Sequence, residues 1–287
     1  MASINMKLLL STLIIGMSVQ ASAQGLLYKV YGEGIKDTSY VYGTYHTKDS
    51  QAYFMKDKIK ELINQCELVA GEVDIEDAKS KASEIAPIMM LPKGELGDLY
   101  SAEDFERVTA YLKDKLGMKF ILCNRLKPFF VLAMLTEKLI EGDEKMVLDE
   151  WIQKQAKKAK KEIVGLETIQ EALAGIDSVS VDEQAKWLLD FIDGGDEQTS
   201  AFEDLNHWYL KQEIDSMYEY YLNEEIPGEF DSEFLVRRNI YFTDRVFEHM
   251  KTQTVFCGVG ALHLPGKTGL LLGLRAKGVN VEVVNAD

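Results

Sequence analysis

The stretch Val41–Thr47, VYGTYHT, places His46 three residues after Gly43, at the end of a segment with the Tyr- and Val-rich composition of a β-strand. The chain has only four histidines. A glycine at a strand end allows a tight turn and lets the backbone come close to a bound group. A lone Gly-x-x-His stretch also occurs by chance, however, and by itself it favours a structural histidine.

The same spacing recurs near the other end of the chain. Gly260–His263, GALH, follows a second predicted strand. In open α/β sheets, ligands bind beyond the carboxyl ends of the strands, where the loops meet. If the two strands are parallel neighbours, His46 and His263 come together in one site, and Gly43 and Gly260 support it.

Two further predicted strands end in acidic residues. Glu67–Asp74, ELVAGEVD, predicts a buried strand, and alternation along it places Glu72 and Asp74 on one face. Glu162–Glu167, EIVGLE, predicts a short strand that ends in Glu167. Because a carboxylate among apolar neighbours is costly without a partner, these three acidic residues are candidate ligands or general bases.

The order of the predicted elements indicates an α/β (α+β) fold. The N-terminal segment predicts a β-hairpin, a helix and a strand, and the C-terminal segment predicts a strand, a helix and a last strand. Mostly helical sequence fills about 85–160 and 180–250. We therefore expect one domain over residues 24–287, with a central mixed β-sheet built from both ends of the chain and a large helical insertion between them.

Two helices of the insertion have clear signals in the sequence. Ser101 is expected to cap the first of them, and Gly117 is expected to end it. The second, predicted over 147–161, is amphipathic. The residues on its expected inner side are Leu148, Trp151, Ile152 and Gln155.

The N-terminus predicts export. Residues 1–23 place Lys7 ahead of a short apolar run and end in the small residues Ala21-Ser22-Ala23, the pattern of a secretory signal peptide. The apolar run is too short for a membrane span. We expect removal of the signal, no membrane anchor afterwards, and a periplasmic or secreted protein.

The net charge bears on the choice of binding partners, and the cysteines bear on metal binding and disulfides. The net charge of −15 at pH 7 repels phosphate backbones, so nucleic acid is not an expected partner. Cys66, Cys123 and Cys257 form no metal-binding spacing and are expected to be buried small hydrophobes. In an oxidising compartment, any two of them are candidates for a disulfide.

Together these motifs resemble the TraB/GumN family, which includes the animal Tiki metalloproteases and is similar to the erythromycin-esterase/ChaN-like superfamily. The resemblance rests on the two Gly-x-x-His stretches, on ELVAGEVD, on GLET at Gly165–Thr168, on RRN at Arg237–Asn239, and on the long motif Gly258–Val284. It covers nearly all of residues 24–287.

The resemblance implies a metal-dependent site made of His46, Glu72 and His263, supported by Arg238 as a charge partner and Asn239 as a hydrogen-bonding residue. We expect an exported metal-dependent hydrolase that acts on a peptide or protein substrate. Imidazole and carboxylate ligands suit manganese, cobalt or zinc, and the resemblance favours manganese or cobalt.

Two alternatives stay open at the level of the sequence. The chain could be a non-catalytic protein of the same fold, in which the histidines hold haem or a peptide without turnover. It could also be a metal-independent hydrolase, in which a histidine acts as general base in the manner of the erythromycin-esterase relatives.

Overall fold

The computed structural model describes residues 25–139, 142–223 and 235–285. The predicted signal peptide, residues 1–23, lies outside these ranges, and its removal stays a prediction. Within the ranges, no helix is both long enough and apolar enough to cross a bilayer. All three cysteines are buried free thiols, as expected for small hydrophobic residues.

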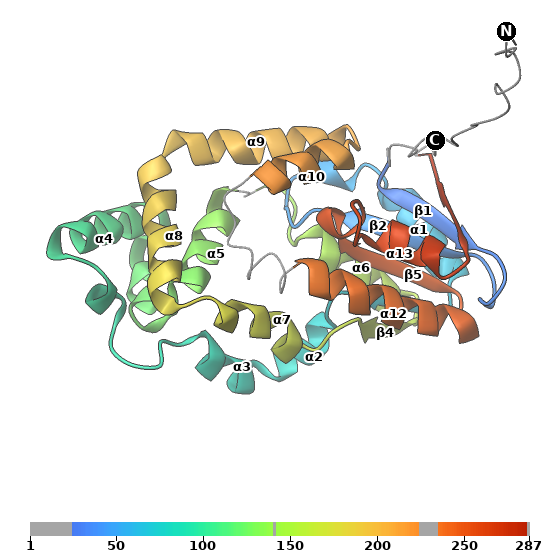
Figure 1. The fold of residues 1–287 in the computed structure, drawn as a ribbon, viewed down its shortest axis with the longest axis horizontal. Helices are drawn as coiled ribbons and strands as arrows, with labels where there is room; N and C mark the ends of the chain where they lie inside the picture. The colour runs from blue at the N-terminus through green and yellow to red at the C-terminus, as the bar shows by residue number, and fades with distance from the viewer. Residues whose placement is uncertain (1–24, 140–141, 224–234, 286–287) are drawn as a thin grey trace, which may run out of the picture.

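A six-stranded mixed sheet forms one half of the molecule (Figure 1). Its strand order is β4-β3-β5-β2-β1-β6. Strands β4, β3, β5 and β2 run parallel, whereas β1 is antiparallel to both of its neighbours. The strands are β1 (Leu27–Tyr31), β2 (Ser39–Thr44), β3 (Leu68–Gly71), β4 (Glu162–Gly165), β5 (Val255–Gly260) and β6 (Asn280–Val283). The predicted sheet from both ends of the chain is confirmed, and β4 adds an edge strand from the middle.

Helices cover both faces of this sheet (Figure 1). Helices α1 (Lys56–Gln65) and α6 (Leu148–Lys158) lie against one face, and α12 (Arg237–Thr252) and α13 (Leu270–Ala276) lie against the other. The connections from β2 to β3 and from β5 to β6 step across the sheet in opposite directions. Because such crossovers are right-handed, their helices are placed on opposite faces.

The helical insertion forms the other half of the molecule and has a buried apolar cluster of its own, built mainly from α4, α5 and α8 (Figure 1). Within the described ranges, the other α-helices are α2 (Ile75–Ser80), α3 (Ala82–Met89), α4 (Ala102–Leu116), α5 (Pro128–Leu139), α7 (Ile169–Ala174), α8 (Val181–Gly194), α9 (Asp196–Leu210) and α10 (Ile214–Asn223). The 3₁₀ helices are η1 (Ser50–Tyr53), η2 (Leu96–Leu99), η3 (Gly117–Arg125), η4 (Gly175–Ser178) and η6 (Ala261–His263). Whether the two halves form a single domain stays a prediction.

The expected ends of α4 are confirmed. The Ser101 hydroxyl accepts a hydrogen bond from the Asp104 N–H, which satisfies one of the free donors at the helix start. Gly117 ends the helix with a φ of 56°, in the left-handed region that glycine adopts without strain.

The inner side of α6 differs from the expected one. Leu148 and Ile152 are buried as predicted, but Gln153 is buried in place of Gln155. Burial of Gln153 is possible because its side-chain amide is hydrogen bonded to the loop after β3: Nε2 donates to the Val73 carbonyl at 2.7 Å, and Oε1 accepts from the Ile75 N–H at 3.0 Å. A helical pattern of apolar residues cannot indicate such a partner.

The two Gly-x-x-His stretches pack against each other at Gly43. Strands β2 and β5 are parallel neighbours, with Thr44 opposite Gly260. A Cβ atom on Gly43 would lie 2.7 Å from Cδ1 of Leu264 and 3.2 Å from Cα of Ala261. An added side chain would therefore have to displace Leu264 and shift the turn that carries His263 by a few tenths of an ångström.

Gly43→Ala is expected to destabilise the protein by about 1–3 kcal/mol through overpacking. The matched control is Gly258→Ala in the neighbouring strand, where the nearest atom to an added Cβ, Cδ1 of Ile152, is at an ordinary 3.5 Å. Urea unfolding of both variants checks this difference. Equal midpoints for the two variants would show that the contact at Gly43 does not constrain the fold.

Candidate functional site

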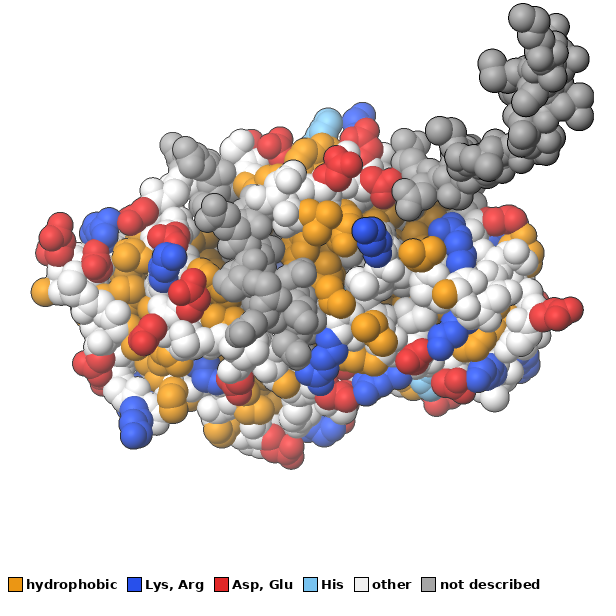
Figure 2. Space-filling model, in the orientation of Figure 1, with side chains coloured by type: hydrophobic (Ala, Val, Ile, Leu, Met, Phe, Trp, Pro, Cys, Tyr) orange, Lys and Arg blue, Asp and Glu red, His pale blue; other side chains and the backbone are white. Residues whose placement is uncertain are grey.

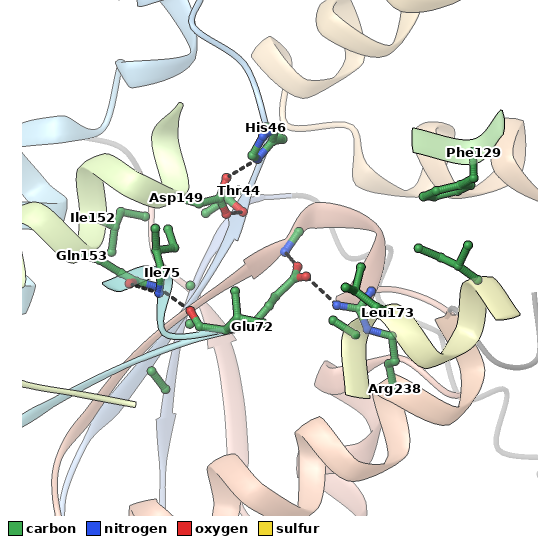
Figure 3. Close-up of a pocket in the computed structure, with 17 residues that line it drawn as sticks. Thr44, His46, Glu72, Ile75, Phe129, Asp149, Ile152, Gln153, Leu173 and Arg238 are labelled. Carbon is green, nitrogen blue, oxygen red and sulfur yellow. Dashed lines mark hydrogen bonds and ion pairs between the residues drawn. The ribbon is translucent and has the colours of Figure 1, made fainter. Parts of the chain in front are cut away.

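Three predicted site residues lie at the carboxyl edge of the parallel strands. His46 follows β2, and His263 ends the short turn η6 that follows β5. Strand β3 pairs with β5 through Gly71 opposite Gly258, so Glu72, the next residue, emerges at the same edge (Figure 3). The predicted convergence of the three strand ends is thus present in the fold.

His263 is a buried imidazole with one nitrogen held in place. Its Nδ1 lies 2.6 Å from Oδ1 of Asn239 on α12. An amide oxygen can only accept, so with the Asn239 amide in this orientation Nδ1 carries the proton and Nε2 keeps its lone pair. Nε2 lies 3.6 Å from Oε1 of Glu72. Burial lowers the pKa of His263 to about 4, more than the neighbouring Glu72 raises it. The ring is therefore neutral at neutral pH and offers a free lone pair.

Glu72 is held as a carboxylate by fixed donors. Its Oε1 accepts from the Gly260 N–H at 2.7 Å, and its Oε2 accepts from the Arg238 guanidinium at 2.7 Å. Burial raises the pKa of Glu72, but the neighbouring His263, Arg238 and Gly260 N–H together bring it well below the ordinary value. A Cβ on Gly260 would lie 3.1 Å from Oε1, so the glycine permits this close contact.

Arg238 on α12 lies between two carboxylates, the half-buried Glu72 and the buried Glu167. It also donates to Glu167, whose side chain is fully buried. Both Nε, at 3.0 Å, and Nη2 of Arg238 donate to Oε1 of Glu167. The Tyr241 hydroxyl donates to the other oxygen of Glu167. The backbone N–H of Glu167 also donates to the Glu72 carbonyl at 2.8 Å, which fixes the spacing of the two acidic residues that share the guanidinium.

His46 has a different environment from His263. Its side chain is 70% exposed, and its Nδ1 lies 3.5 Å from Oδ2 of Asp149, in the first turn of α6. The Asp149 carboxylate is the main cause of a raised pKa for His46, with smaller contributions from Glu72 and Glu137. The polar partner of His46 is Asp149, whereas those of His263 are Asn239 and Glu72. The two motifs therefore lie on neighbouring strands, but their imidazoles have different partners.

The donor atoms around His263 suit a divalent metal ion. The 3.6 Å between its Nε2 and Oε1 of Glu72 is close to the spacing of two ligands on one ion with bonds of about 2.0–2.2 Å. An oxygen partner on the other ring nitrogen, here Asn239, is typical of metal-ligating histidines. Within the described ranges, no group of three or more His, Cys, Asp or Glu side chains is placed to hold an ion. Two of the three predicted ligands are thus adjacent, and the metal site stays a prediction.

A pocket of about 420 Å³ opens at this edge of the sheet, between the sheet and the helical insertion (Figure 3). Its apolar wall is built by both halves of the molecule, with residues of α6 and of the β3–α2 connection on one side and residues of α5, α7 and η4 on the other. Its polar residues are Thr44, His46, Glu72, Asp149, Gln153 and Arg238. Its larger apolar residues are Val73, Ile75, Phe129, Ile152, Leu173 and Ile176.

Asp74 lies away from this pocket. Strand β3 ends at Gly71, so the expected alternation does not extend to Glu72 and Asp74. The Asp74 carboxylate instead caps α2, accepting from the Glu76 and Asp77 N–H groups at 2.9 and 3.1 Å. It lines a second, more open depression on the Glu167 side of the sheet, and a supporting role for it in the site stays a prediction.

Besides Thr44, the polar pocket residues that the sequence did not indicate are Asp149 and Gln153. Both are on α6, which the sequence presents as an ordinary amphipathic helix. An acidic residue in the first turn of a helix is expected from the helix dipole alone, so Asp149 gave no separate signal. Only its position beside His46 shows that it belongs to the site (Figure 3).

Arg238→Met is expected to destabilise the protein by about 3–5 kcal/mol at about pH 8, because the buried Glu167 and the half-buried Glu72 then lack their shared cation. Without the guanidinium, the folded-state pKa of Glu72 rises above the unfolded value, and that of Glu167, which burial already raises, rises further, so folding takes up protons. The deficit relative to wild type should therefore shrink as the pH falls from about 8 to about 5.

Urea unfolding at both pH values measures this effect. Glu167→Gln serves as the control, since it keeps a hydrogen-bonding group beside Arg238 and Tyr241 and should cost only about 1–3 kcal/mol. A deficit for Arg238→Met that is independent of pH, or smaller than that of Glu167→Gln, would contradict the role of Arg238 as the shared cation.

Comparison with known proteins gives one finding. Residues 26–283, nearly the whole chain, match the TraB/PrgY/gumN family. No curated protein and no solved structure matches the chain. The match covers both Gly-x-x-His stretches, Glu72 and the Arg238-Asn239 pair, so all the residues assembled at the strand ends lie within it. The chain belongs to the TraB/PrgY/gumN family.

Proposed function

We propose that this protein is an exported, metal-dependent hydrolase that cleaves peptides. The observation that carries the proposal is the arrangement at His263: a neutral buried imidazole whose Nδ1 is fixed by Asn239 and whose Nε2 faces the ionised Glu72 at 3.6 Å. Neutral imidazole and carboxylate are the protonation states that ligate metal ions. An arrangement of this kind needs no rearrangement of protons before an ion binds.

His46, Glu72 and His263 are the residues that would hold the ion, with manganese or cobalt favoured by the family resemblance and zinc possible. A bound ion would supply a nucleophile by lowering the pKa of its water, and it would polarise the scissile carbonyl. The contribution of the chain itself is preorganisation. Arg238 and the Gly260 N–H keep Glu72 ionised and oriented, and Asn239 keeps Nε2 of His263 unprotonated.

The pocket supports a peptide as substrate. It offers a polar edge at His46, Glu72 and Arg238 and an apolar wall of aliphatic and aromatic side chains. Figure 3 shows Ile75 and Ile152 on one side of it and Phe129 and Leu173 on the other. An apolar side chain of the substrate would be removed from water between these walls while the bond to be cleaved lies at the polar edge.

The proposals that the protein is exported and that it does not bind nucleic acid rest on the sequence. The signal-like residues 1–23 support a periplasmic or secreted location, and the net charge of −15 speaks against nucleic acid. On the face shown in Figure 2, the described Lys and Arg side chains are interspersed with Asp and Glu. Such a surface gives a polyanion no extended basic stripe to follow across this face.

His46→Ala/His263→Ala is expected to lose the stoichiometric divalent metal and the metal-dependent cleavage of a peptide library, because two of the three proposed ligands are removed. Elemental analysis of protein purified without chelator, followed by a cleavage assay with added manganese or cobalt, measures both. The matched control is His207→Ala/His249→Ala, which removes the two histidines that lie on α9 and α12 outside the pocket.

The same variants, assayed also with chelator and with haem, separate the alternatives. Equal metal content in the two double variants would contradict the metal site. Cleavage that survives exhaustive chelation would favour the metal-independent, esterase-like hydrolase. A Soret band on adding haem, lost in His46→Ala/His263→Ala and without any peptide cleavage, would favour the binding protein.

Leu173→Ala is expected to lower kcat/KM for peptides with a large apolar residue next to the cleaved bond by about tenfold, because a pocket wall loses buried contact with the substrate. Peptides with serine at that position should be affected much less. Leu272→Ala, which truncates an exposed leucine of α13, is the control. Equal losses for apolar and polar peptides would show that Leu173 does not contact the substrate side chain.

A further inference from the structure

The two motif histidines share one feature that the family match does not assign. In each, Nδ1 faces a side-chain oxygen from a helix outside the motif: Oδ1 of Asn239 on α12 for His263, and Oδ2 of Asp149 on α6 for His46. The first distance is 2.6 Å and the second is 3.5 Å. The other ring nitrogen, Nε2, faces Oε1 of Glu72 at 3.6 Å in His263, whereas the described contacts of His46 include no protein oxygen at Nε2.

Asp149 is built to offer an oxygen to His46. Its Oδ1 accepts a hydrogen bond from the Thr44 hydroxyl, two residues before His46 in the same motif. Its Oδ2 is buried and makes no hydrogen bond. Because a buried carboxylate oxygen without a donor is costly, a donor is expected there, and the described atom at ion-pair distance is Nδ1 of His46.

The environment of the Asp149 carboxylate suits an acceptor for the His46 ring. Asp149 lies in the first turn of α6, where the helix dipole favours a negative charge. Ile152, one turn further along the same helix, is fully packed against the sheet at 1% exposure, so the helix start is anchored. The carboxylate is therefore fixed, whereas the ring of His46 is 70% exposed and has no comparable packing of its own.

We propose that Asp149 is the positioning residue of His46: its free oxygen accepts the Nδ1–H proton, holds the ring against α6, and leaves Nε2 as the nitrogen available to a ligand. A carboxylate behind a ligating imidazole fixes the tautomer and the ring orientation. The inference rests on the proposed function only for the identity of that ligand, since the tautomer of His46 is a property of the metal-free protein.

The tautomer can be read directly by ¹⁵N NMR of the full-length, chelator-treated protein labelled at histidine. The four histidines of the chain keep the spectrum simple, and the signals of His46 are identified by their loss in His46→Gln. At about pH 9, well above the ordinary histidine pKa, the proposal predicts the Nδ1–H form for His46. In Asp149→Ala, the signals should shift towards the Nε2–H form that free imidazole prefers.

Glu150→Ala is the matched control, because it removes the neighbouring carboxylate of the same helical turn, which pairs with Lys79 and does not line the pocket. This variant should leave the His46 signals unchanged, and the Nδ1–H form of His263 should persist in both variants. A second readout is the affinity for manganese alone, which should fall by about tenfold or more in Asp149→Ala and stay at the wild-type value in Glu150→Ala.

Two results would overturn the proposal. One is an Nε2–H form of His46 in the wild-type protein, which decides the question even if Asp149→Ala does not fold. The other is an unchanged His46 tautomer in folded Asp149→Ala. If the wild-type protein shows the Nδ1–H form and binds no manganese, the assignment of Asp149 is supported while the proposed metal-dependent function fails.

Discussion

The parallel pairing of β2 with β5 is the constraint on which the rest of the site depends. It joins segments from opposite ends of the chain, and its register places Gly43 opposite Val259 and Thr44 opposite Gly260, so the two Gly-x-x-His stretches begin one residue apart along the sheet. Gly43 lets the turn after β5 pack directly on β2. Because β3 pairs with the other side of β5, Glu72 emerges beside that same turn. The site follows from the order of three adjacent strands.

Buried charge then determines what these residues can do. Arg238 is the cation shared by Glu72 and Glu167, and its guanidinium keeps Glu72 ionised where burial alone would favour the protonated acid. Burial acts on His263 in the opposite sense and keeps its ring neutral. The result is an anionic oxygen and a neutral nitrogen facing each other, with protonation states set by fixed neighbours and not by solvent.

The sequence predicted the sheet and its construction from both ends because the strands carry clear Val- and Tyr-rich patterns that stop at glycines. Of the three residues expected in one site, Glu72 and His263 lie within 3.6 Å of each other, whereas the described partner of His46 is Asp149. The sequence pattern was wrong about the strand that carries Glu72, because Gly71 ends β3 and the chain turns at once into α2, where Asp74 is the cap. Local alternation cannot anticipate a strand end that depends on tertiary contacts.

Other features could not be predicted from local patterns at all. The side-chain amide of Gln153 is buried because it bonds to a loop far away in the sequence. Asp149 looks like any acidic residue in a first helical turn until the fold brings α6 beside β2. Arg238 and Asn239 were indicated only by resemblance to a family, and the structure places them in contact with Glu72, Glu167 and His263.

We propose that the strand-end cluster around His263 and Glu72 holds a metal ion. Anomalous X-ray scattering from crystals grown with manganese locates the ion without reference to activity. We expect a peak at a coordination distance of roughly 2 Å from both Nε2 of His263 and the nearer oxygen of Glu72. Manganese bound only at acidic side chains elsewhere on the surface, with Nε2 of His263 free, would contradict it.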